Sequence, residues 1–271
     1  MKALINGVTM AYDEAGSGPA VVLIHGFPLN RNMWRPQAAA LSEAGYQVIT
    51  PDLRGFGESE VPDGPYSVDL YSDDVAGLLD HLGIERAIVG GMSMGGYVLL
   101  NLLERYPQRV SAACFITTRS NADDEAGKAR RLALAKDVTA SGPQVVADLF
   151  KTLLFAEETA AIKPELVSEI YGWMMDTDSR GLAGGLLAMR ERKDYTQLLG
   201  HFTLPALVIG AEHDLAVPLE SVRVLEAGLP DSKTCIIPHA GHMANMEQPE
   251  TFNACLLKFL QGCSTRDRTA P

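Results

Sequence analysis

Short, largely apolar runs recur along the chain, and helical patterns separate them. A run of this kind is typical of a strand buried on both faces, which occurs where helices cover both sides of a parallel sheet. The clearest runs lie at residues 20–24 (AVVLI), 110–116 (VSAACFI) and 204–210 (LPALVIG). Their alternation with helices predicts an α/β fold, with a mostly parallel sheet and helices on both of its faces.

Eight strands are expected in total. The chain opens with a hairpin pattern, in which residues 3–5 and 8–12 flank Asn6-Gly7, a strong hairpin signal. The other strands are predicted at residues 20–24, 46–50, 86–89, 110–116, 204–210 and 233–237. Helices are predicted at residues 32–44, 67–82, 94–106, 218–227 and 249–259, before a polar tail at 262–271 that we expect to fray.

The stretch from residue 119 to residue 199 lacks a convincing buried strand. It carries candidate helices at residues 123–139, 144–153, 164–173 and 178–190. A stretch of about eighty residues is much longer than one crossover connection needs. We therefore expect residues 119–199 to form a helical cap between the sixth and seventh strands. Residues 1–118 and 200–271 then form the core.

Charge and composition narrow the function classes. The 271 residues include 23 Lys and Arg against 34 Asp and Glu, a formal net charge of −11. Nucleic acids and anionic membranes both require a basic surface, so neither is an expected partner. No apolar run reaches the roughly 18 residues of a membrane span, and the first residues are too polar for a signal peptide. We therefore expect a cytoplasmic protein.

Cofactor and metal motifs are missing from the sequence. There is no P-loop and no dinucleotide-binding glycine pattern. His239 and His242 have the spacing of a metal pair, but no carboxylate ligand pattern accompanies them, so we expect no metal and no cofactor. The four cysteines show no paired spacing. Cys114 and Cys235 lie in apolar runs and are expected to be buried thiols in a reduced protein.

Residues 91–95 (GMSMG) match the pattern G-x-S-x-G. The five-residue pattern alone is weak, but a predicted strand precedes it and a predicted helix follows it, as a nucleophile elbow requires. The strained turn leaves little room for neighbouring side chains, and Gly91, Gly95 and Gly96 supply that room. The sequence thus predicts Ser93 as a nucleophile at a helix N-terminus, where negative charge is favoured.

A serine hydroxyl needs a base to remove its proton and a carboxylate to orient that base. In this arrangement the acid and then the histidine follow the serine along the chain. We choose His242 as the base, because its glycine-containing loop lies just before a helix, with His239 as the alternative. We choose Asp214 as the acid, with Glu212 as the alternative, because both follow the strand at residues 204–210.

The oxyanion hole requires backbone N–H groups beside the reacting carbonyl. We expect one from Met94, the residue after the nucleophile, and one from Phe27 in the loop at residues 25–28 (HGFP). Pro28 has no N–H and cannot be the donor. His25 is expected to be structural and to pack beneath the site.

Five motifs resemble those of the α/β-hydrolase superfamily, in the same order. They lie at residues 25–28 (HGFP), 52–59 (DLRGFGES), 91–96 (GMSMGG), 210–214 (GAEHD) and 240–243 (AGHM). Within the superfamily, the chain is most similar to small carboxylesterases, 3-oxoadipate enol-lactonases and cofactor-free haloperoxidases or perhydrolases. The resemblance implies the α/β-hydrolase fold and a triad of Ser93, Asp214 and His242. Ser93 stands where epoxide hydrolases and haloalkane dehalogenases carry aspartate, which argues against those activities.

The expected reaction is hydrolysis of a small carboxylic ester or lactone through an acyl-enzyme on Ser93. Phe27, Trp173 and Met243 are candidate substrate-binding residues. Pro28 follows the oxyanion residue, as in perhydrolase-like members of the superfamily. Attack of hydrogen peroxide on the acyl-enzyme is therefore one alternative.

Two further functions stay open. A carbon–carbon bond hydrolase uses the same triad and needs cationic groups for a substrate carboxylate, for which Arg119 and Arg190 are available. A receptor that retains the fold is an alternative from another class, although a complete triad argues against it. The sequence indicates no oligomeric state.

Overall fold

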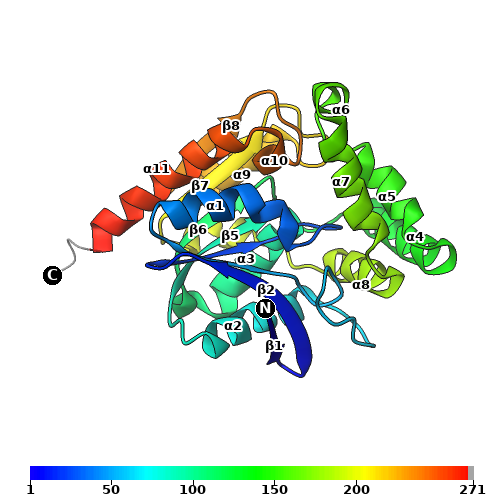
Figure 1. The fold of residues 1–271 in the computed structure, drawn as a ribbon, viewed down its shortest axis with the longest axis horizontal. Helices are drawn as coiled ribbons and strands as arrows, with labels where there is room; N and C mark the ends of the chain where they lie inside the picture. The colour runs from blue at the N-terminus through cyan, green and yellow to red at the C-terminus, as the bar shows by residue number, and fades with distance from the viewer. Residues whose placement is uncertain (268–271) are drawn as a thin grey trace.

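The computed structural model describes residues 1–267 and contains an eight-stranded sheet with the strand order β1-β2-β4-β3-β5-β6-β7-β8 (Figure 1). β2 pairs antiparallel with both β1 and β4, and the other neighbours pair parallel. The predicted mostly parallel, eight-stranded sheet is confirmed. The strands are β1 Lys2–Ile5, β2 Val8–Ala15, β3 Ala20–Ile24, β4 Gln47–Pro51, β5 Ala87–Met92, β6 Val110–Ile116, β7 Ala206–Ala211 and β8 Ser232–Ile237.

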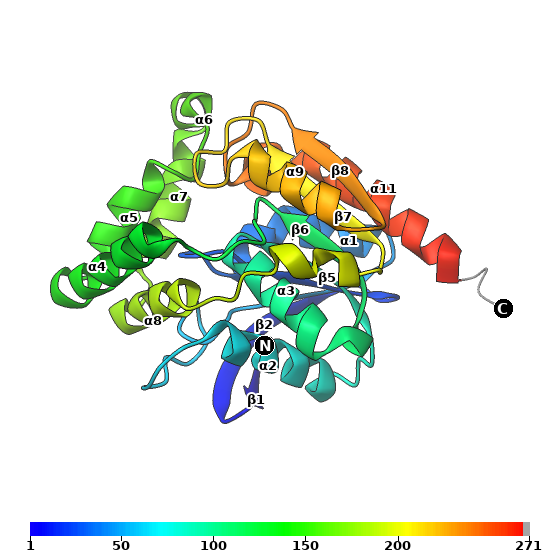
Figure 2. The same cartoon turned by 180° about the vertical axis from the view of Figure 1, so that it is seen from behind.

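Helices cover both faces of the sheet. One apolar cluster joins the strands to α1, α10 and α11, and a second joins them to α2, α3 and α9. Figure 1 shows α1 and α11 in front of the sheet, and Figure 2 shows α2, α3 and α9 from behind. These helices are α1 Arg35–Glu43, α2 Val68–His81, α3 Met94–Arg105, α9 Leu219–Gly228, α10 Ala244–Glu247 and α11 Pro249–Asp267, with short 3₁₀ turns η1 Arg31–Trp34, η2 Pro107–Arg109 and η3 Thr196–His201.

Helix α3 lies deeper in the molecule than a surface helix. Every residue from Met94 to Leu103 is buried. A helix that is apolar around its whole circumference is stable only when it is surrounded by other elements. The first turn of α3 is therefore held firmly against the sheet, and the residue immediately before it, Ser93, has a rigid support.

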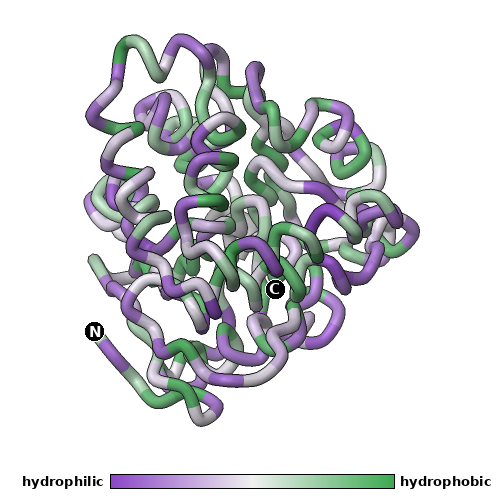
Figure 3. Tube along the Cα trace, turned by 90° about the vertical axis from the view of Figure 1, so that its right-hand side faces the viewer, coloured by the Kyte–Doolittle hydropathy of each residue, from purple (hydrophilic) through white to green (hydrophobic). Residues whose placement is uncertain are grey.

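The segment between β6 and β7 is helical. We call residues 119–199 the cap segment. Figures 1 and 2 show its green helices gathered at one end of the sheet, and Figure 3 shows hydrophobic and hydrophilic residues alternating along the helical turns. The helices are α4 Glu125–Ser141, α5 Gln144–Lys151, α6 Glu157–Ile162, α7 Pro164–Met175 and α8 Ser179–Arg190. Four of them match the predicted candidates, whereas the six-residue α6 was not predicted.

The C-terminal region differs from the expectation of a frayed tail beginning at Gly262. Helix α11 continues to Asp267, and the predicted tail at residues 268–271 lies outside the described residues. The short helix α10 was also not predicted, because four residues are too few to show a helical period. Within residues 1–267, no helix is both long and apolar enough to cross a membrane.

The expectation of fully reduced cysteines is wrong in the structure. Cys235 of β8 and Cys255 of α11 form a disulfide between residues whose Cα atoms are 6.6 Å apart. Cys235 is only partly buried, because β8 is the edge strand of the sheet and α11 packs beside it. A disulfide is unusual in a reducing compartment, so this bond is at odds with the expected cytoplasmic setting.

Candidate active site

The G-x-S-x-G segment forms a sharp turn between β5 and α3. Ser93 has a φ of +52° and a ψ of −111°, a conformation that L-residues rarely adopt. A Cβ on Gly91 would overlap the carbonyl of Gly95, and a Cβ on Gly95 would overlap the carbonyl of Ile24 in β3. Both positions are therefore restricted to glycine by backbone contacts, which leave no side chain to move aside.

The backbone of Ser93 is fixed by β6 and the loop that follows it. Its N–H donates to the carbonyl of Ile116 at 3.0 Å, and its carbonyl accepts from the Thr118 hydroxyl at 2.7 Å. A Cβ on Gly96 would collide with the Thr118 side chain, so the third elbow glycine makes room for this hydrogen bond. The strained turn is thus held by specific contacts on both sides.

Asp214 and His242 form the best-defined pair in the site. His242 Nδ1 lies 2.7 Å from Asp214 Oδ2, and the two side chains are 2% and 1% exposed. The other oxygen, Oδ1, accepts from the N–H groups of Ala216 and Val217, each at 2.8 Å. These two donors hold the carboxylate in one orientation, in which Oδ2 faces Nδ1 of His242.

The alternative acid and base lie elsewhere. Glu212 is exposed, and its Oε2 accepts from the backbone N–H of His239 at 2.9 Å; this hydrogen bond lowers the pKa of Glu212. His239 is exposed and contacts Glu158 of the cap at 3.9 Å. The structure therefore brings Asp214, rather than Glu212, to His242.

These exposed residues form a cluster in which a metal could bind. One potential ligand atom from each of Glu212, His213 and His239 lies within 4.8 Å of the others. The sequence spacing of His239 and His242 is that of a metal pair for which we expect no metal; in the structure His239 lies beside His213, with the ring centroids 6.4 Å apart. All three side chains are exposed, whereas the side chains of Asp214 and His242 are buried.

A cavity of about 670 Å³ lies between the strand ends and the cap segment. Ser93, His242 and Phe27 contribute to its wall from the core. The residues described here contain no hydrogen bond between the side chains of Ser93 and His242; such contacts often tighten only when substrate is bound. Most of the apolar wall comes from the cap segment, through Leu134, Leu149, Phe150, Leu153, Leu186 and Met189.

The two amides predicted for the oxyanion hole come from the loop after β3, which contains Phe27, and from Met94, the first residue of α3. Within the described residues, neither the N–H of Phe27 nor that of Met94 donates to another protein group. A Cβ on Gly26 would lie 3.3 Å from the Cβ of Ser93, so the loop before Phe27 runs close to the serine. The peptide bond between Phe27 and Pro28 is cis.

His25 is fully buried beneath this loop. Its Nδ1 lies 2.8 Å from the carbonyl of Gly26, and its Nε2 accepts from the N–H of Leu53 at 3.0 Å. These partners require a neutral imidazole with its proton on Nδ1, and burial lowers the pKa of His25 accordingly. Both ring nitrogens are occupied, so His25 serves the loop geometry.

Two expected substrate-binding residues do not line the cavity. Trp173 is half-buried in the cap and packs beneath the guanidinium of Arg35, 5.8 Å from the ring centroid. Met243 is completely buried, and its N–H donates to the carbonyl of Leu154. Of the three expected residues, only Phe27 lies on the cavity wall. The helical spacing of the sequence does not indicate which methionines and aromatic residues pack inside the cap.

The cationic residues on the wall differ from those expected. Arg119 lines the cavity and donates through Nη2 to the carbonyl of Ala216, whereas Arg190 does not line it and pairs with Glu191. Sequence reasoning missed Arg130 and Arg131, which line the cavity from α4; their only signal was their position in the cap segment. Arginines that line a cavity can bind anionic groups.

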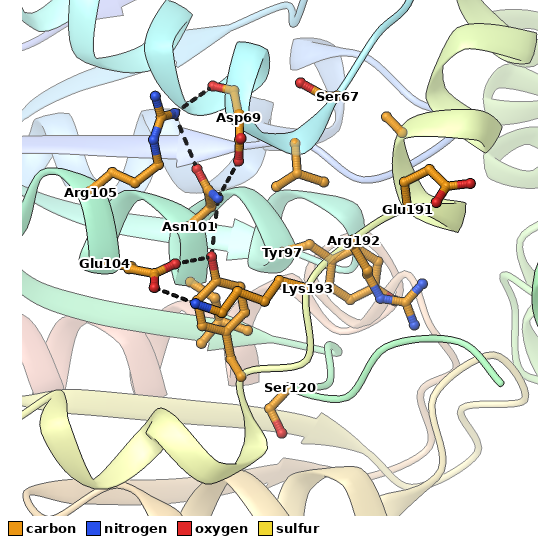
Figure 4. Close-up of a pocket in the computed structure, with 14 residues that line it drawn as sticks. Ser67, Asp69, Tyr97, Asn101, Glu104, Arg105, Ser120, Glu191, Arg192 and Lys193 are labelled. Carbon is orange, nitrogen blue, oxygen red and sulfur yellow. Dashed lines mark hydrogen bonds and ion pairs between the residues drawn. The ribbon is translucent and has the colours of Figure 1, made fainter.

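Figure 4 shows the residues that line a second cavity, of about 290 Å³. Its wall is polar and internally paired; for example, Asn101 Nδ2 donates to Asp69 Oδ1 at 2.7 Å. Tyr97 lines both cavities, and the Arg192 guanidinium lies 4.4 Å from the centroid of its ring. Arg192 also donates to Asp123 at 2.8 Å. Tyr97 is therefore a residue that the two cavity walls share.

Comparison with known proteins gives consistent similarities. A family profile described as "alpha/beta hydrolase fold" matches residues 19–249. A thermophilic esterase from Thermogutta terrifontis, solved with malate bound, is 34% identical with a TM-score of 0.94, covering 97% of this chain and 98% of that one. An enol-lactonase from Burkholderia xenovorans LB400 is 29% identical (TM-score 0.90; 96% and 100% covered). A bromoperoxidase from Bacillus anthracis is 27% identical (TM-score 0.86; 96% and 100% covered).

Proposed function

The chain belongs to the α/β-hydrolase fold family, and from this premise we propose that it is a serine hydrolase that cleaves small carboxylic esters or lactones. The observation that carries the proposal is the buried Asp214–His242 pair, whose histidine lines the same cavity as Ser93. The solved relatives described as an esterase and an enol-lactonase support this substrate class. The mainly apolar cavity, of about 670 Å³, has a size that suits small substrates.

The proposed reaction has two acyl-transfer steps. The Ser93 hydroxyl attacks the ester carbonyl while His242 Nε2 takes its proton, and Asp214 stabilises the resulting imidazolium. The N–H groups of Phe27 and Met94 hold the oxyanion, and one such donor typically contributes about 3 kcal/mol to the transition state. His242 then protonates the leaving alcohol. In the second step it activates a water that hydrolyses the acyl-enzyme.

Covalent labelling tests the nucleophile directly. A fluorophosphonate should modify the wild-type protein on Ser93, as read by peptide mass spectrometry, and should leave Ser93→Ala unlabelled. The same variant should lose on the order of 10⁶ in turnover of a short p-nitrophenyl ester. Absence of labelling, together with absence of turnover across a panel of esters and lactones, would favour the non-catalytic receptor.

Peroxide-dependent acyl transfer is a second candidate activity at the same site. The likeness to a bromoperoxidase and the presence of Pro28 after Phe27 favour it. In this reaction hydrogen peroxide replaces water and attacks the acyl-enzyme, which releases a peracid and regenerates the Ser93 hydroxyl. If the purified protein forms no detectable peracid from acetate and hydrogen peroxide, this candidate is excluded.

Hydrolysis of a carbon–carbon bond has weaker support. That reaction would use Arg119 to bind a substrate carboxylate, and Arg119 does line the cavity, but the other expected arginine, Arg190, does not. Parallel assays with a short p-nitrophenyl ester and a ring-cleavage dienoate separate this activity from ester hydrolysis. Our proposal predicts turnover of the ester alone.

A further inference from the structure

A second buried carboxylate lies close to the proposed base and outside the triad. Glu247, in α10, is 1% exposed. Its Oε1 accepts from the N–H of Gly241 at 2.9 Å, and Gly241 immediately precedes His242. Burial raises the pKa of Glu247, whereas the hydrogen bonds around the carboxylate oppose that rise. A buried carboxylate without such donors would be strongly destabilising, so these contacts explain why this one is tolerated.

The other side of the same carboxylate contacts the cap segment. Glu247 Oε2 accepts from the N–H of Ala156 at 2.9 Å and from the Thr159 hydroxyl at 2.5 Å. Its backbone carbonyl accepts from Lys163 Nζ at 2.6 Å. These donors lie in or beside α6, which Figures 1 and 2 place next to the loops that follow β7 and β8. One side chain therefore bridges the histidine loop and the cap.

Independent contacts hold the same two segments together. A Cβ on Gly241 would overlap the backbone of residues 155–156, so the loop lies directly against the cap. The N–H of Met243 donates to the carbonyl of Leu154 at 2.9 Å. On the core side, the hydroxyl of Thr117 donates to the carbonyl of His242 at 3.2 Å. The backbone on both sides of the base is thus fastened to cap residues.

We propose that Glu247 is a positioning residue, which ties the His242 loop to the cap segment and so fixes the imidazole relative to Ser93. This inference rests on the proposed function. It gives the cap a role in catalysis besides enclosing substrate. Because a displacement of about 1 Å of a catalytic group can cost about 10²-fold in rate, a link at this point affects turnover more than substrate binding.

Glu247→Gln is the main test variant. It keeps the shape of the side chain but replaces one acceptor oxygen with a donor NH₂, so either the Gly241 contact or the cap contact is lost. We expect kcat for a short p-nitrophenyl ester to fall by about 10- to 100-fold with little change in KM. Labelling of Ser93 by a fluorophosphonate should slow in parallel. Thr159→Val removes only the cap hydroxyl and should cause a smaller loss in the same direction.

The control is Glu250→Gln, an exposed position in the first turn of α11. It should keep wild-type kinetics. The dependence of kcat/KM on pH distinguishes positioning from a merely structural role. Its acid limb reports the ionisation of the base, and this limb should shift in Glu247→Gln but not in the control. If Glu247→Gln is folded and shows wild-type kcat, labelling rate and pH profile, the proposal is overturned. If that variant does not fold, Thr159→Val decides on the same criteria.

One measurement is independent of ester hydrolysis. The titration of His242, followed by NMR without substrate, should differ between wild type and Glu247→Gln and should be unchanged in Glu250→Gln. A wild-type protein that neither turns over esters nor labels at Ser93 would contradict the proposed function, and the NMR titration would still test the positioning role. An unchanged His242 titration in Glu247→Gln would refute that role.

Discussion

Replacing Asp214 by asparagine should invert the tautomer of His242. In the native site, Asp214 Oδ1 accepts from two backbone N–H groups, those of Ala216 and Val217, while Oδ2 faces His242 Nδ1. An asparagine must place its carbonyl oxygen toward the two N–H donors, because its NH₂ group cannot accept from them. The NH₂ group then faces Nδ1, which must become the acceptor. The ring proton moves to Nε2, so the base can no longer take the serine proton.

The expected loss of turnover is that of an active site whose histidine has the wrong tautomer while the packing around it is intact. Loss of this kind reduces turnover by about 10⁴-fold, which is about 5 kcal/mol in activation free energy. Asn is isosteric with Asp, so the fold should be retained. Turnover of a short p-nitrophenyl ester by Asp214→Asn, at saturating substrate and neutral pH, measures the effect.

The matched control is Glu212→Gln, which changes the other carboxylate that follows β7. Glu212 is exposed and contacts the His239 loop, so its substitution should leave turnover near the wild-type value. If Asp214→Asn kept more than a tenth of wild-type turnover, the tautomer argument would be refuted. If Glu212→Gln were the inactive variant, the acid would have to be reassigned to Glu212.

Three further outcomes are expected. Gly95→Ala should destabilise the fold by about 3 kcal/mol or more in urea unfolding, because its Cβ would overlap the carbonyl of Ile24; an unchanged midpoint would contradict this. Burial raises the pKa of Asp123, but hydrogen bonds such as the one from Arg192 lower it overall from 3.8 to about 2, so the ionised carboxylate stabilises the fold. Asp123→Asn should therefore reduce the free energy of unfolding by about 2 kcal/mol at pH 7. This difference from the wild type should disappear as the pH falls through 3.8 toward 2. For Arg119→Met, the ratio of kcat/KM for a monoanionic hemiester to kcat/KM for its neutral isostere should fall by about tenfold, because Arg119 lines the cavity. An unchanged ratio would show that Arg119 does not bind the anion.

The sheet and the elbow could be predicted because their constraints are local. Buried strands require apolar runs, and the turn at Ser93 requires small residues at fixed offsets, so both leave a direct trace in the sequence. The choice of Asp214 over Glu212 was harder, since both follow the same strand. It depends on which carboxylate meets the N–H groups of the next turn, and only the structure shows this.

The residues that sequence reasoning missed act through distant contacts. Glu247 touches residues about ninety positions away, and no local pattern marks a buried glutamate as different from an exposed one. Cys235 and Cys255 are separated by 20 residues and lie in a strand and a helix, so their spacing did not indicate a bond. The cavity wall was also unpredictable, because no motif in the cap helices marks the residues that face the cavity.

The cap segment is inserted between β6 and β7, so the proposed catalytic residues and most of the apolar cavity wall come from different parts of the chain. Ser93 and the Asp214–His242 pair are attached to strand ends of the core, whereas most of the apolar cavity wall belongs to residues 119–199. A transplant of this segment from a related enzyme should therefore carry substrate preference with it and leave bond cleavage to the host. The grafted segment should retain groups that donate hydrogen bonds to Glu247, as the N–H of Ala156 and the hydroxyl of Thr159 do here.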